Sequence, residues 1–427
     1  MSDRLNILYI FTDQQFAGAM SCAGNQELHT PAMDSLAETG VLFENAYCSQ
    51  PLCTPSRGSM FTGRMPHETG IDFNGIPIPD EIRDQSMGNL FEAAGYDCAY
   101  AGKWHLPRGS VDDEHGFREL IGFGDIGLAE ACIDYLKEPK DRPFLLVASY
   151  DNPHNICEWA RHQNLPYGNI PRVPTEDCPN LPANFAIPPF EPDAIRFEQA
   201  QQPLIYPTVN YSDEEWRHLR HAYFRLIEKV DAEIGKILDT VRDLGLDENT
   251  LIIFSSDHGD GHGSHHWNQK SALYEEQIRI PYIVSLKGAT KGGHVDRSHL
   301  VSNGLDIIPT ICDYAGIEAP DGLRGRSVRS IAETGAADEW RNQLVVETYF
   351  GESQSKTRGR ALRTNRYKYT VYSFGMYREQ LTDMENDHGE MVNLAANSKY
   401  RDVLQEHRDQ LQKWCEETGD NFKVPID

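Results

Sequence analysis

The chain has 427 residues, of which 39% are hydrophobic, so it can bury a large core and exceeds the size at which one core usually stops growing. Its formal net charge of −25 argues against nucleic acid or an anionic membrane as a partner, because both would be repelled at long range. Nine cysteines without a CxxC pair indicate buried thiols and no disulfide framework. We expect a larger domain at residues 1–335 and a smaller subdomain at 336–427.

No apolar run approaches the length of a membrane span. The first residues also lack a charged leader followed by an apolar signal segment. We therefore expect a cytoplasmic chain with no membrane partner, or a periplasmic or secreted one if an export signal has been removed.

Short apolar runs alternate with helical patterns over most of the chain. Runs rich in Ile, Leu, Val, Phe and Tyr predict buried parallel strands at residues 6–12, 98–101, 144–150, 250–256 and 281–286. The spacing of apolar residues between them predicts helices at 31–39, 86–94, 126–137 and 213–244. This alternation is typical of an α/β fold with a mostly parallel central sheet sandwiched by helices.

Two parts of the chain depart from this alternation. Residues 163–209 contain many prolines and little periodicity, which predicts a long surface segment able to wall a cleft. Beyond about residue 335, short strand patterns occur at 344–350, 360–364 and 367–372. A helical pattern follows at 398–416. We expect these to form a smaller C-terminal α+β subdomain with a short antiparallel sheet.

Potential metal ligands follow two of the predicted strands. Asp13 and Gln14 follow the first strand, and Asp257 and His258 follow the strand at 250–256. Because the carboxyl ends of parallel strands meet at one edge of a sheet, we expect these side chains to converge. Carboxylates, an amide oxygen and an imidazole suit one divalent ion, for which we expect Ca²⁺, with Mn²⁺ or Mg²⁺ as alternatives.

The stretch Cys53-Thr54-Pro55-Ser56-Arg57 predicts a nucleophile at the start of a helix. Thr54 can act as the N-cap and Pro55 as the first helical residue. Cys53 would then lie where free backbone N–H groups and the helix dipole attract an anion, with Arg57 one turn further in as a second cationic group. We therefore expect an anionic substrate.

At these residues the chain resembles the type I, formylglycine-dependent sulfatases of the alkaline-phosphatase-like superfamily. The signature CxPSR followed by TGR is matched at residues 53–57 and 62–64. The resemblance implies that a maturation enzyme oxidises Cys53 to formylglycine, whose hydrate attacks the sulfur of a sulfate monoester. It also implies that the metal is held by Asp13, Gln14, Asp257, His258 and the formylglycine at position 53.

Three further stretches resemble sulfatase motifs and contain basic residues: GKWH at 102–105, PH at 153–154 and GxH with a later Lys at 263–270. The resemblance implies that Lys103 and Lys270 neutralise the oxygens of the transferred group. It assigns proton transfer on the aldehyde hydrate to His105 and protonation of the leaving alkoxide to His154.

Residues near these motifs are candidates for substrate binding. Trp159 and Arg161 follow the PH motif and can contact a sugar by stacking and charge pairing, and His265 belongs to the GxH motif. With the predicted wall at 163–209, they favour a sulfated saccharide over a small aryl sulfate.

Two other functions stay open. The pairs Asp-Gln and Asp-His, which contain Gln14 and His258 here, also resemble the metal ligands of the phosphonate monoester hydrolase branch of the superfamily. The substrate can therefore instead be a phosphonate or phosphate diester. The second alternative is a non-catalytic saccharide-binding protein in which Cys53 stays unmodified.

Overall fold

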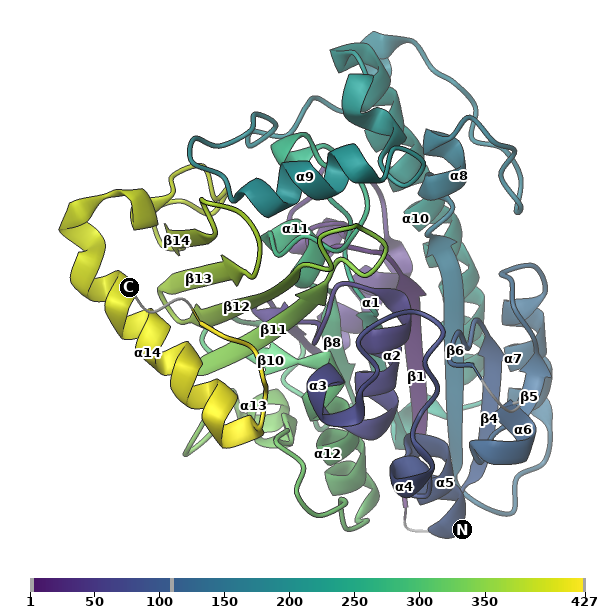
Figure 1. The fold of residues 1–427 in the computed structure, drawn as a ribbon. Helices are drawn as coiled ribbons and strands as arrows, with labels where there is room; N and C mark the ends of the chain where they lie inside the picture. Colours follow the sequence, from purple (N-terminus) through teal and green to yellow (C-terminus); the bar gives the residue numbers. More distant parts are fainter. Residues whose placement is uncertain (1–3, 108–110, 425–427) are drawn as a thin grey trace.

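The central feature of the fold is an eight-stranded sheet in the order β5-β4-β6-β1-β7-β8-β2-β9. Figure 1 labels β5, β4, β6, β1 and β8 of this sheet. The computed structural model describes residues 4–107 and 111–424. The strands of this sheet are β1 (Asn6–Asp13), β2 (Val41–Phe43), β4 (Asp97–Gly102), β5 (Arg118–Ile121), β6 (Phe144–Pro153), β7 (Thr250–Ser256), β8 (Tyr282–Ser285) and β9 (His294–Asp296).

Strand β1 lies in the middle and pairs in parallel with both β6 and β7. The predicted mostly parallel sheet is therefore confirmed. One strand differs from the prediction: β8 runs antiparallel to β7 and to β2. The connection between β7 and β8 contains a 3₁₀ turn at Ser264–His266 and the short helix α11 (Glu275–Ile278), whereas a parallel crossover usually contains a longer α-helix.

Helices cover both faces of the sheet and form a separate apolar core on each. One core contains residues of α1 (Pro31–Thr39), α7 (Leu128–Lys137) and the long helix α10 (Asp213–Asp243). The other contains residues of α2 (Cys53–Thr62), α5 (Met87–Ala93) and α12 (Asn303–Ala315). Alternate residues of β1 point into the two cores, which is why its apolar run is continuous.

The predicted start of α10 is confirmed by its capping box. The hydroxyl oxygen of Ser212 accepts a hydrogen bond from the backbone N–H of Glu215, and the carboxylate of Glu215 accepts one from the backbone N–H of Ser212. The segment 163–209 is mostly irregular, as predicted, but it also contains the helix α9 (Asp193–Gln201). No helix among the described residues has the length and apolar character needed to cross a membrane.

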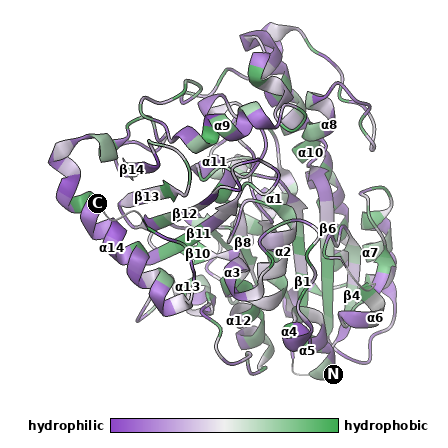
Figure 2. Cartoon of the chain, in the orientation of Figure 1, coloured by the Kyte–Doolittle hydropathy of each residue, from purple (hydrophilic) through white to green (hydrophobic). Residues whose placement is uncertain are grey.

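The C-terminal part forms the expected antiparallel sheet, with one more strand than predicted. Its strands are β11 (Gln343–Tyr349), β12 (Arg358–Thr364), β13 (Tyr367–Tyr372) and β14 (Glu379–Asp383). Helix α14 (Arg401–Thr418) packs on it, and Figure 2 shows this helix as largely hydrophilic. Leu344 and Val346 of β11 pack into the core that contains α2, α5 and α12, whereas Val345 packs between the C-terminal sheet and α14. Because β11 contributes to both cores, the boundary at residue 335 stays a prediction.

The remaining elements are short. They are β3 (Ala46–Tyr47), β10 (Val301–Ser302), α3 (Pro66–Thr69), α4 (Asp80–Arg83), α6 (Val111–Glu114), α8 (Ile156–Ala160) and α13 (Arg329–Thr334). The nine cysteines are free thiols, and all except Cys22 are buried.

A buried ionic network joins α3 to the C-terminal sheet. His67 Nδ1 lies 2.6 Å from Glu347 Oε1, and the other oxygen of Glu347 lies 3.2 Å from the guanidinium of Arg360. Arg360 also donates two hydrogen bonds to the carboxylate of Asp420. Burial alone would lower the pKa of His67, but Glu347 raises it above its usual value.

This network predicts a pH-dependent contribution to stability. The folded state binds the His67 proton more tightly than the unfolded chain, so the contribution is full below about pH 6.5 and declines as pH rises through the folded-state pKa. His67→Gln should lower the free energy of unfolding at pH 6 by roughly 1–3 kcal/mol, and less at pH 8.5. Urea unfolding of both proteins across this range measures the difference, and a difference independent of pH would contradict the assignment.

Candidate active site

Polar side chains from strands far apart in sequence meet at the carboxyl edge of the sheet, near the upper ends of β1 and β6 in Figure 1. Asp13 ends β1, and Asp257 directly follows β7. The potential ligand atoms of Asp13, Cys53, Asp257 and His258 all lie within 4.8 Å of one another, and all four residues are buried. The expected convergence is therefore observed.

Cys53 is the first residue of α2, and every residue of that helix is buried. The N-cap is Leu52, so the prediction that Thr54 caps the helix is wrong. The hydroxyl of Thr54 instead donates to the backbone carbonyl of His105 at 2.8 Å, and its N–H donates to Asn74 Oδ1 at 3.1 Å. Cys53 still lies at the positive end of the helix dipole.

Arg57 joins the two carboxylates. Its Nε donates to Asp257 Oδ2 at 2.9 Å and one terminal nitrogen donates to Asp13 Oδ2 at 3.0 Å. The other terminal nitrogen donates to Ser149 Oγ and to the carbonyl of Lys103. Arg57 has no exposed surface, and all three nitrogens are engaged. Arg57 therefore orients the two carboxylates, and its direct contact with an anionic substrate stays a prediction.

Two lysines flank position 53. Lys103 Nζ lies 2.8 Å from Asp13 Oδ2 and 2.9 Å from Asp151 Oδ1. Lys270 Nζ lies 3.1 Å from the sulfur of Cys53 and 2.9 Å from Gln14 Oε1. The site thus brings two ammonium groups close to position 53, together with the carboxylates of Asp13 and Asp151.

The surroundings of Cys53 favour an anion there. Burial and Asp13 alone would raise the pKa of the thiol, but Lys270, Lys103 and His258 together hold it well below its usual value. His258 Nε2 lies 3.3 Å from the sulfur. An anionic oxygen attached to residue 53 would meet the same stabilising charges.

The carboxylates suit a bound cation. Burial and the neighbouring Asp13 raise the pKa of Asp257, as expected where two carboxylates crowd one another. The donor set of two carboxylates and an imidazole fits a divalent ion. The amide oxygen of Gln14 faces Lys270, and its Nε2 donates to Asp260 Oδ2 at 2.6 Å, so its role as a metal ligand stays a prediction.

His154 lies beside the same group. Burial, Lys103 and Lys270 lower the pKa of its imidazole, whereas Asp13 and a hydrogen bond with Cys53 raise it. A sulfate group placed between the lysines would add negative charge and raise that pKa. His154 is therefore placed to exchange a proton with a ligand at position 53.

The other predicted site residues lie further out. The imidazole of His105 is exposed, and its catalytic role stays a prediction. His265 has no exposed surface and stacks on Tyr274 with ring centroids 3.7 Å apart, so direct contact with a substrate does not fit this geometry. Trp159 is half-buried on α8, and Arg161 donates to the carbonyl of Leu204; their substrate contacts stay predictions.

Two residues at the site were not predicted. Asp151 forms an ion pair with Lys103. Like Asp13, Asp151 directly follows an apolar run, and this pattern could have identified it as a site residue. Phe123 is 68% exposed, with its ring centroid 5.6 Å from Lys103 Nζ. Phe123 lies in a Gly-Phe-Gly loop that carries no comparable signal.

Comparison with known protein families identifies the family of this chain. The family model described as "Sulfatase" matches residues 5–127 and 125–317, and the one described as "N-sulphoglucosamine sulphohydrolase, C-terminal" matches residues 263–417. The chain belongs to the sulfatase family. The expected family, fold class and enzyme class are thereby confirmed.

Individual relatives resemble this sulfatase over nearly its whole length. The Δ4,5-hexuronate-2-O-sulfatase of Bacteroides thetaiotaomicron is 29% identical, covering 99% of this chain and 91% of the relative. An ulvan-active sulfatase of Formosa agariphila is 30% identical, covering 98% and 82%. The solved structure of a 2-O GAG sulfatase is 28% identical, covers 100% of this chain and 95% of its own, and superposes with a TM-score of 0.88.

The position of Arg57 in this sulfatase makes a testable prediction. Arg57→Lys keeps the positive charge, but an ammonium group lacks the planar guanidinium that contacts Asp13 and Asp257 through two different nitrogens. We expect kcat for nitrophenyl sulfate to fall about 100-fold or more, with KM nearly unchanged, because the site is misaligned while substrate contacts persist. Steady-state kinetics measures this.

Arg360→Lys is the matched control, because Arg360 is equally buried between two carboxylates but lies in the network of His67. It should lower the melting temperature without lowering kcat. A large rise in KM with unchanged kcat in Arg57→Lys would instead place Arg57 on the substrate.

Proposed function

We propose that this sulfatase hydrolyses a sulfate monoester of a carbohydrate, using formylglycine formed from Cys53 by a maturation enzyme. The observation that carries the proposal is the placement of Cys53 at a buried helix start, 3.1 Å from Lys270 and beside the Asp13–Asp257 pair. Serine at this position would form a stable sulfate ester, whereas an aldehyde hydrate has a second hydroxyl whose deprotonation releases the sulfate.

One divalent ion completes the proposed site. Asp13, Asp257 and His258 would hold it, with the amide oxygen of Gln14 as a further ligand. Ca²⁺ is the expected ion because most of these donors are oxygens, and Mn²⁺ or Mg²⁺ are the alternatives. When bound, the ion would lower the pKa of a hydroxyl on residue 53.

The chain's own residues account for binding and proton transfer. Lys103 and Lys270 both stabilise negative charge at position 53 and neutralise the peripheral oxygens of the sulfate. Arg57 keeps Asp13 and Asp257 aligned. His154 donates a proton to the departing alcohol, and His105 accepts one from residue 53 when sulfate is released.

A carbohydrate is the proposed organic part of the substrate. Two relatives are named for activity on a hexuronate sulfate and on ulvan. The exposed ring of Phe123 beside Lys103 offers an apolar face on which a sugar ring can stack.

The first test concerns the nucleophile. In protein co-produced with a maturation enzyme, we expect an intact mass in which the CH2SH group of Cys53 has become an aldehyde, with its sulfur and two hydrogens lost and one oxygen gained. We also expect sulfate release from sulfated mono- and disaccharides. Cys53→Ala should abolish multiple turnover, and Cys53→Ser should leave at most a slowly resolved sulfated enzyme. Full turnover by Cys53→Ala would exclude this mechanism.

The same protein distinguishes the phosphonate alternative. The comparison is kcat/KM for nitrophenyl sulfate against a phenyl phosphonate ester with a matched leaving group. A phosphonate monoester brings a second organic group among Lys103, Lys270 and His154, so we expect the sulfate to be preferred. Faster turnover of the phosphonate, with no sugar sulfate cleaved, would reverse the assignment.

The role of His154 predicts a dependence on the leaving group. A sugar alkoxide needs protonation as it departs, whereas nitrophenolate is already a weak base. His154→Ala should therefore slow a sugar sulfate by about 100-fold or more while slowing nitrophenyl sulfate much less. Equal losses on both substrates would assign His154 to binding.

A further inference from the structure

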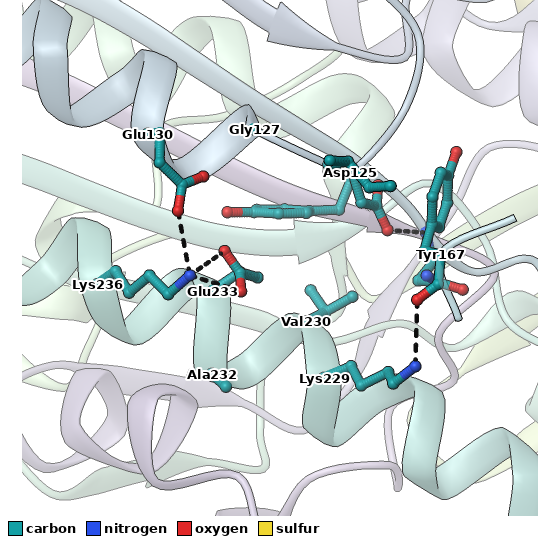
Figure 3. A pocket seen from close by; sticks show the side chains of 12 residues that line it. Asp125, Gly127, Glu130, Tyr167, Lys229, Val230, Ala232, Glu233 and Lys236 are labelled. Carbon is teal, nitrogen blue, oxygen red and sulfur yellow. Dashed lines mark hydrogen bonds and ion pairs between the residues drawn. The ribbon is translucent and has the colours of Figure 1, made fainter. Parts of the chain in front are cut away.

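A cavity of about 560 Å³ lies between α7 and α10, beside the end of β6 (Figure 3). This volume is in the range of small-ligand sites. Figure 3 shows Lys236 with Glu130 and Glu233 at one end, and Tyr167, Lys229 and Asp125 at the other.

The cavity is linked to the catalytic site through Asp151. One oxygen of its carboxylate lies 2.9 Å from Lys103 Nζ, and the other accepts a hydrogen bond from Tyr167 Oη at 3.2 Å. Asp125 accepts hydrogen bonds from the backbone N–H groups of Asp151 and Asn152, at 2.6 and 3.1 Å. The wall of the cavity and the catalytic lysine therefore share one carboxylate.

Two buried polar atoms of the lining have no hydrogen-bond partner among the described residues. They are Tyr150 Oη and Asn152 Oδ1, and their residues are at most 2% exposed. Buried polar groups in native proteins are nearly always satisfied, so an unpartnered pair lining one cavity indicates a polar ligand or bound water.

The charge at the two ends of the cavity differs. Lys236 is paired with Glu130 and Glu233. Lys229 donates only to the backbone carbonyls of Tyr167 and Gly168, and no ion pair of Lys229 occurs in the described parts of the chain. Asp125 also lines this end, but its carboxylate is engaged by two backbone N–H groups, so Lys229 is the cation available to an anionic group.

We infer that this cavity binds a second, acidic sugar unit of an oligosaccharide whose sulfated unit occupies the site at residue 53. The inference rests on the proposed function. The carboxylate or sulfate of that unit pairs with Lys229, and its hydroxyls satisfy Tyr150 and Asn152. Ile126 is 72% exposed at the cavity and gives the ring an apolar contact. The loop that contains Phe123 and Asp125 joins the two sites.

The test compares two variants with one control. Ala232 is exposed on α10 and lines the cavity, so Ala232→Trp fills it from the surface. Lys229→Ala removes the unpaired cation, and Arg242→Ala is the control, an exposed cation of α10 outside the cavity. The substrates are nitrophenyl sulfate, a sulfated monosaccharide, and a tetrasaccharide carrying the same sulfated unit and uronic acids.

We expect kcat/KM of the unmodified enzyme to be about tenfold or more higher for the tetrasaccharide than for the monosaccharide. Ala232→Trp and Lys229→Ala should each remove most of that preference while leaving nitrophenyl sulfate turnover nearly unchanged. Arg242→Ala should behave like the unmodified enzyme. Unchanged tetrasaccharide kinetics in both variants would overturn the inference, and Lys229→Ala alone decides it if Ala232→Trp does not fold.

A binding measurement separates this inference from the proposed function. If the unmodified enzyme releases no sulfate from any substrate, the proposed function fails, and calorimetric titration with the desulfated tetrasaccharide then tests the cavity. Binding that is lost in Ala232→Trp and Lys229→Ala but retained in Arg242→Ala supports the cavity as a saccharide site. Equal binding by all variants, or none by the unmodified protein, excludes it.

Discussion

The site depends on the bridge that Arg57 makes between Asp13 and Asp257. One carboxylate ends β1 and the other directly follows the neighbouring parallel strand β7, and both are fully buried. Two unpaired charges in such a place would be strongly unfavourable, so the guanidinium and Lys103 are needed to hold them together. A divalent ion in the same group would complete the compensation of charge.

The bridge also fixes the position of the first turn of α2. Cys53 and Arg57 are four residues apart and therefore lie on the same face of the helix. When Arg57 is engaged with both carboxylates, Cys53 is brought to the same point, between Lys270 and His258. The positive end of the helix, the lysines and the ligand group consequently act on one atom, the one attached to Cβ of residue 53.

Sequence reasoning identified the residues at strand ends, because an apolar run followed by a polar residue marks the carboxyl edge of a parallel sheet. Asp13, Asp257 and Lys103 carry this signal. It could not show the direction of side chains: Arg57 turned inward to the carboxylates, the hydroxyl of Thr54 bonded a neighbouring loop, and His265 stacked on Tyr274. Helix α9 was missed because the prolines around it dominate the local pattern, and β8 was expected to be parallel because an apolar run does not reveal strand direction.

The most direct test of this account is the position of the metal. Crystals of the formylglycine-containing enzyme loaded with Mn²⁺ should show one strong anomalous peak per chain, coordinated by Asp13, Asp257 and His258 and adjacent to residue 53. Asp257→Asn should lose both the peak and turnover. A peak elsewhere, or full sulfate release by protein shown to be free of metal, would contradict the central role of the carboxylate pair.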